Sequence, residues 1–123
     1  MVFGHIMVPT NREGRAMTDL EEKFHQAMLG IYESAKRECQ YNALHFFKMV
    51  VDRGGLETAH RLLATGQPSD NFTALWMYRR LDLSVEALVL KPEFASLFSD
   101  AERRIAKSRL AEYGYKPGAS NVY

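Results

Sequence analysis

The sequence predicts an all-α protein, a compact bundle of five or six short helices in a single domain. Apolar residues recur at spacings of three and four through most of the chain, which is typical of amphipathic helices. Two capping boxes, Thr18 to Glu21 and Ser99 to Glu102, indicate helix starts. The 123 residues, 46% hydrophobic and 25% charged, suit one globular domain that buries roughly two-thirds of its unfolded surface.

The predicted domain spans residues 17–115. Residues 1–16 contain Gly4, Pro9, Asn11 and Gly14 without a sustained period, so we expect an irregular N-terminal arm. The GHIM segment is typical of a cloning-site remnant, and the arm is therefore either native or partly vector-derived. Residues 116–123 lack periodicity and predict a flexible tail.

The first helix begins after Thr18 and runs to about Glu38. The second follows Asn42, a predicted N-cap with a hydrophobic staple beside it, formed by Tyr41 and Phe46. Gly54 predicts the end of this helix at Arg53, because glycine enters the left-handed region without a Cβ penalty.

A third helix is predicted over residues 56–64, closed by Gly66. Its expected outward face holds Glu57, Thr58 and Arg61. The fourth helix carries Phe72, Leu75, Trp76 and Tyr78, and its candidate caps are Ser69, Asp70 and Asn71.

Ser84 predicts the start of another helix over residues 85–90, although the composition of this segment also suits a strand. A short turn follows Pro92. The last helix begins after Ser99 and ends at Gly114, with Ile105, Ala106, Leu110 and Tyr113 on its apolar face.

Charge and cysteine content restrict the class of protein. Sixteen Lys and Arg against fifteen Asp and Glu leave a net charge of +1, so bulk charge does not favour nucleic acid or membrane. Cys39 is the only cysteine, which excludes an intrachain disulfide. No apolar run approaches the roughly 20 residues that span a bilayer. We expect a soluble, cytoplasmic protein without a membrane partner.

Two segments are candidates for nucleic-acid binding. The helix-Gly-Gly-helix unit around Gly54 is compatible with a helix-turn-helix, in which Glu57, Thr58, His60 and Arg61 would read bases. The alternative is an ordinary helical hairpin. The last helix gathers Arg103, Arg104, Lys107 and Arg109, a face that would either contact phosphates or simply be solvated.

Enzymatic motifs are not apparent in the sequence. The histidines lack the close spacing of a zinc-binding helix, and Gly54-Gly55 lacks the spacing of a phosphate loop. We therefore predict no catalytic residues, no metal and no cofactor. An enzyme would need a site assembled from distant residues such as His45, His60, Asp82 and Glu86.

The stretch from Phe24 to Leu63, with Tyr41-Asn42-Ala43 ahead of Gly54-Gly55 and the later segment RLDLSVEA from Arg80, resembles a group of small bacterial proteins of unassigned function. The resemblance implies that the shared domain covers residues 17–115 and implies no activity.

The most direct functional prediction is a non-enzymatic binding module. Near-neutral charge together with many Met and aromatic residues favours a protein partner or a homo-oligomer. The alternative is nucleic-acid binding through Arg103, Arg104, Lys107 and Arg109, or through His60 and Arg61.

Overall fold

Helices account for nearly all the regular structure of the chain. The computed structural model describes residues 17–115, and within this range it contains six α-helices, two 3₁₀ helices and no strand. The all-α prediction is therefore confirmed, and residues 85–89 are helical rather than extended. The predicted arm (1–16) and tail (116–123) lie outside the described residues. The elements are α1 (Asp19–Cys39), α2 (Leu44–Arg53), α3 (Gly55–Ala64), α4 (Asp70–Met77), η1 (Leu81–Leu83), α5 (Val85–Val89), η2 (Pro92–Leu97) and α6 (Asp100–Glu112).

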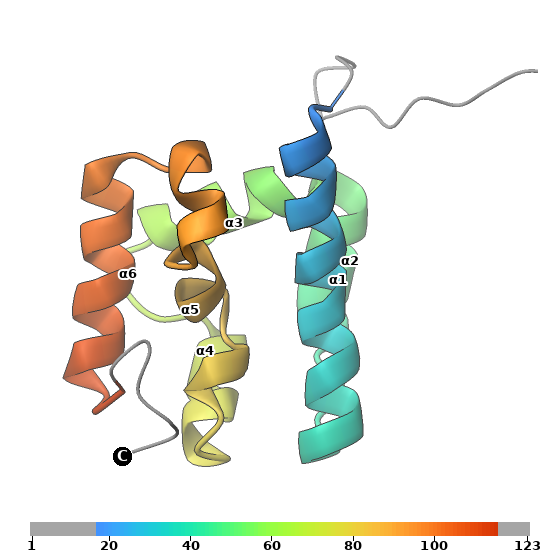
Figure 1. Ribbon diagram of the computed structural model, residues 1–123. Coiled ribbons are helices and arrows are strands. Elements are labelled where there is room, and N and C mark those ends of the chain that lie inside the picture. The colour runs from blue at the N-terminus through green and yellow to red at the C-terminus, as the bar shows by residue number, and fades with distance from the viewer. Residues whose placement is uncertain (1–16, 116–123) are drawn as a thin grey trace, which may run out of the picture.

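α3 runs across the molecule and packs against helices at both of its edges (Figure 1). Figure 1 shows α1 and α2 side by side at one edge and α6 at the opposite edge, with α4 and α5 between them. α3 contacts α1, α2, α5 and α6, and so joins the two edges. α1 also contacts α5, η1 and η2 directly, so the two edges belong to one domain.

Two clusters of apolar side chains form the core. The larger cluster centres on Phe24, whose ring meets those of Phe94 and Phe98 edge-on at centroid distances of 5.1 and 5.3 Å. The second cluster lies between the end of α1, α4 and α6, and includes the buried thiol of Cys39. Tyr41 and Leu90 pack against both clusters, so the core is continuous.

Helices begin at the predicted N-caps wherever the capping group is a Ser or Thr hydroxyl just before the helix. Thr18 and Ser99 form complete capping boxes with Glu21 and Glu102. Ser84 caps α5, and Ser69 is the cap of α4 among the three candidates there. Each hydroxyl accepts a backbone N–H that the helix leaves unpaired, which explains why these starts are readable from sequence.

The predicted cap of α2 is wrong. Ala43 occupies the N-cap position and no side chain caps the helix. The Asn42 amide oxygen instead accepts a hydrogen bond from the Tyr32 hydroxyl at 2.8 Å, so the contact with α1 outcompetes capping. The other end agrees with prediction: α2 ends at Arg53, and Gly54 has a φ of +88°.

Two predictions for α3 are also wrong. Thr58 is buried instead of facing solvent, because its hydroxyl donates to the Met49 carbonyl oxygen at 3.0 Å and closes the α2–α3 corner. Gly66 is not the helix terminator. The helix ends at Ala64 with Thr65 extended, and the Thr65 hydroxyl donates to the Leu62 carbonyl oxygen.

Gly55 permits the closest approach between α3 and α1. Its amide donates to His25 Nδ1 at 2.8 Å, and a Cβ at this position would lie 2.8 Å from the His25 Cα. Only glycine fits there without moving one of the helices. The Gly-Gly pair therefore has two separate roles, a turn at Gly54 and a close contact at Gly55.

Candidate functional site

Arg109 does not belong to the predicted basic face. Its side chain is buried and its guanidinium pairs with the Glu86 carboxylate at 2.9 Å. It also donates to the backbone carbonyl oxygens of Leu62 and Thr65. Burial raises the pKa of Glu86, while the pairing with Arg109 opposes that rise. Arg109 thus joins α6 to α5 and to the end of α3, and is not available for a nucleic acid.

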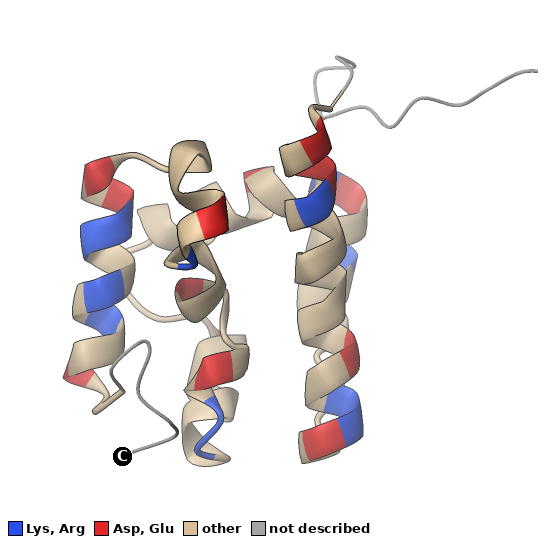
Figure 2. Ribbon diagram, in the orientation of Figure 1, with Lys and Arg blue, Asp and Glu red and all other residues tan. Residues whose placement is uncertain are grey.

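The other three cations of that face remain together on α6. Figure 2 shows Lys and Arg in successive bands along this helix, with Asp and Glu at its two ends. Arg103, Arg104 and Lys107 line a shallow hollow of about 220 Å³ with Leu90 and Asp100. None of the three cations forms an ion pair with a residue in the range 17–115, and Arg103 Nε has no hydrogen-bond partner there.

His60 and Arg61 both contact carboxylates. His60 Nδ1 lies against the Glu102 carboxylate of α6, and Arg61 donates to Glu57 one turn earlier at 2.8 Å. Burial alone would raise the pKa of Glu102, but hydrogen bonds from Ser99 and His60 outweigh it and hold that pKa below its usual value. With Thr58 buried as well, α3 offers few free groups to a base edge.

Arg80 belongs to an ion-pair network at the end of α1. It donates to both Asp82 oxygens at 3.0 and 2.9 Å and to Glu38 at 2.7 Å. The hydrogen bond and charge of Arg80 lower the pKa of Glu38. Arg79 and Arg80 follow the end of α4, where their backbone amides donate to the carbonyl oxygens of Trp76 and Leu75 at 3.0 and 2.8 Å.

Exposed aromatic and methionine side chains gather where α4 ends. Trp76, Met77 and Tyr78 are 41%, 73% and 51% exposed. The Trp76 ring meets the Tyr113 ring edge-on at 5.3 Å, and the two line a hollow of about 530 Å³ with Met77 and Arg79. We call Trp76, Met77, Tyr78, Arg79 and Tyr113 the aromatic surface.

Three of the four residues suggested for an assembled catalytic site have other partners. His60, Asp82 and Glu86 contact Glu102, Arg80 and Arg109 respectively. Among the described residues, no group of three or more His, Cys, Asp or Glu side chains is placed to hold a metal ion. None of the helices within 17–115 has the length and apolar character to cross a membrane.

Sequence reasoning missed the two features that depend on contacts distant in the chain. The Glu86–Arg109 pair joins residues on α5 and α6, and no local spacing marks it. The aromatic surface combines the end of α4 with the end of α6. A run of Trp, Met and Tyr at a helix end was its only available signal.

Known proteins add no constraint on the function. The chain matches no protein-family model, no curated protein and no solved structure. The resemblance to small bacterial proteins stays a prediction.

Proposed function

We propose that this protein is a non-enzymatic helical binding module that associates with another protein chain, including a second copy of itself, through the aromatic surface. The exposure of three consecutive large side chains, Trp76, Met77 and Tyr78, carries this proposal. Exposing such side chains to water is unfavourable, and burying them against a partner would contribute about 25 cal/mol of favourable free energy per Å² of apolar area. Trp, Tyr, Met and Arg are also the residues enriched in protein interfaces and their hot spots.

Charge substitution at Met77 tests the proposal. Met77 is 73% exposed, so Met77→Glu should leave the fold intact while weakening association at least about tenfold, equivalent to about 1.4 kcal/mol. Val51→Glu is the matched control, because Val51 is a 57% exposed apolar residue on α2, away from the aromatic surface. Sedimentation velocity over a concentration series measures self-association.

A different partner would be detected by affinity capture. The expected partner binds the wild-type and Val51→Glu chains and is lost with Met77→Glu, and binding is then reproduced with that partner purified. A chain that stays monomeric at high concentration and captures no protein sensitive to Met77→Glu would overturn the proposal.

Nucleic-acid binding is the second candidate, and the unpaired state of Arg103, Arg104 and Lys107 favours it. Three phosphate contacts would give a slope of about −2.7 for the logarithm of affinity against the logarithm of salt concentration. Lys107→Gln should reduce that slope by about 0.9, while Lys48→Gln on α2 should not. Fluorescence anisotropy with a labelled duplex measures both, and the absence of binding at low salt would remove this candidate.

A further inference from the structure

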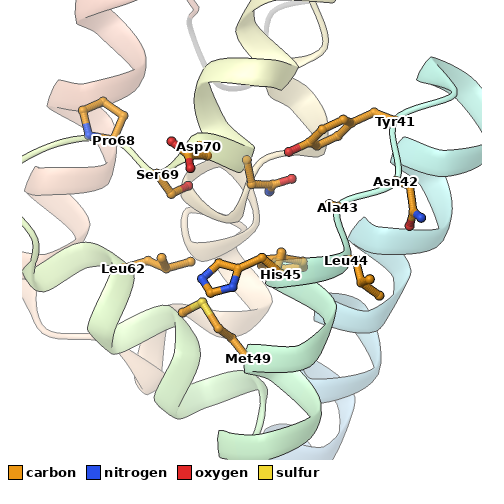
Figure 3. Close-up of a pocket in the computed structure, with 12 residues that line it drawn as sticks. Tyr41, Asn42, Ala43, Leu44, His45, Met49, Leu62, Pro68, Ser69 and Asp70 are labelled. Carbon is orange, nitrogen blue, oxygen red and sulfur yellow. The ribbon is translucent and has the colours of Figure 1, made fainter.

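A cavity of about 500 Å³ opens where three parts of the chain meet. The start of α2, the end of α3 and the start of α4 contribute its walls (Figure 3). Its volume falls in the range of about 300–1,000 Å³ typical of small-molecule sites. None of its lining residues belongs to the hollow on α6 or to the aromatic surface, although the ring of its lining residue Tyr41 lies 6.4 Å from that of Tyr78.

One side of the cavity carries hydrogen-bonding groups. In Figure 3, the Tyr41 hydroxyl is directed toward the start of α4, where Ser69 and Asp70 lie, and the His45 ring lies across from them beside Met49. Burial, assisted by the Asp70 charge, raises the pKa of the Tyr41 phenol, so this hydroxyl keeps its proton at neutral pH. Asp70 is the only acidic group among the described lining residues, and they include no Lys or Arg.

Asn71 adds an unused acceptor to the same side. The residue is 6% exposed, and its side-chain oxygen has no hydrogen-bond partner in the described chain. A buried carbonyl oxygen left unpaired is destabilising by about 1–3 kcal/mol. The oxygen is enclosed by protein, so a ligand in the cavity would reach it only after the Asn71 side chain turns. A ligand donor would then supply the hydrogen bond that this oxygen lacks.

The opposite wall is apolar. Phe46 and Met49 of α2 and Leu62 of α3 line it, whereas Pro68 lies beside Ser69 on the other side (Figure 3). Methionine adapts its shape to a ligand and makes favourable contacts with aromatic rings. A hydrocarbon or aromatic body of modest size therefore suits this wall, and a donor group suits the other.

We propose that this cavity binds a small organic amine, whose protonated amino group meets the Asp70 carboxylate and the Asn71 amide oxygen while its apolar body lies against Met49 and Leu62. The amine supplies the donors that the polar side lacks, and its charge complements that of Asp70. Against this, α2 begins without a side-chain cap, and its partial positive charge favours an acid instead. The experiment must separate these two ligand charges.

Three probes that join a phenyl ring by a two-carbon chain to different polar groups distinguish the alternatives: phenethylamine, 2-phenylethanol and 3-phenylpropionate. Each is titrated into the ¹⁵N-labelled full chain, and the amide shifts of Tyr41, His45 and Asn71 are followed. We expect saturable shifts with phenethylamine and about fivefold weaker binding of the alcohol, since Asp70 is exposed and partly screened. Equal binding of the alcohol, tighter binding of the acid, or no saturable shift would overturn the proposal.

Substitutions in the cavity wall test whether phenethylamine binds at this site. Asp70→Asn should lower the affinity for phenethylamine to that for the alcohol and leave the affinity for the alcohol unchanged. Asp100→Asn is the control, because Asp100 occupies the equivalent first position of α6 after its serine cap. His45→Trp should fill the cavity and abolish binding with little change in Tm, since His45 is exposed. An equal loss in Asp100→Asn, or full binding by His45→Trp, would also overturn it.

Discussion

Gly55 shows how a single missing methyl group determines the spacing of two helices. A Cβ here would lie 2.8 Å from the backbone of His25, a contact that only movement of α1 or α3 relieves. Gly55→Ala should destabilise the fold by about 1–3 kcal/mol, the usual effect of overpacking. Gly30→Ala is the control, because Gly30 lies within α1 with nothing near its Cβ position, and should stabilise by about 0.5–1 kcal/mol. Urea denaturation measures both, and equal effects of the two variants would contradict the contact.

Arg109 is the residue whose loss should be most damaging. Arg109→Met leaves the Glu86 carboxylate buried and unpaired, which should lower the free energy of unfolding by about 3–5 kcal/mol at neutral pH. Burial holds the pKa of Glu86 above its ordinary value in the folded state, and losing Arg109 raises it further. The folded variant therefore binds an extra proton, and its stability should fall as pH rises above the ordinary glutamate range.

Urea denaturation at acidic and neutral pH tests this dependence. Arg104→Met on the same helix removes an exposed charge and should change stability little at either pH. If Arg109→Met were equally destabilising at both pH values, the unpaired carboxylate would not be the cause.

At the scale of helices, the capping boxes are the most predictable features. Ser99→Ala removes the hydroxyl that accepts the Glu102 backbone N–H and should lower the free energy of unfolding by about 1 kcal/mol, measured as a decrease in Tm. Ser108→Ala, an exposed position within α6, should have no such effect. A similar decrease in both variants would show that serine removal, not capping, is responsible.

An interaction can be predicted from the sequence at this scale when its two residues are close together in the chain. Ser99 finds its partner three residues later, and so its role is visible in a short window. Asn42 has the same capping chemistry but bonds to Tyr32 on another helix. Arg109 lies in a pattern typical of a solvated cation, and only its contact with Glu86 on another helix shows that it is buried. The cavity of about 500 Å³ likewise depends on α2, α3 and α4, which are separate in the sequence, meeting in space. The all-α class and the helix starts that use a local hydroxyl were therefore predictable, whereas the cap of α2 and the surfaces were not.

The whole domain should unfold as one unit. Its two apolar clusters share Tyr41 and Leu90, and α3 contacts helices at both edges. Neither half retains a complete core when the other opens, so we expect a single two-state transition. Trp76 fluorescence reports on the α4 end, while far-UV circular dichroism reports on all helices. Their denaturation midpoints should coincide, and separated midpoints would show that the second cluster melts independently.

Cys39 makes the last turn of α1 open to chemical measurement. The thiol is 8% exposed, and burial raises its pKa, so both access and ionisation slow its reaction with alkylating reagents. Its neighbours include the network in which Arg80 joins Glu38 to Asp82. The rate at which this single cysteine is labelled would therefore report how often α1 separates from η1 in the native protein. A ligand or partner that stabilises this contact should slow the labelling.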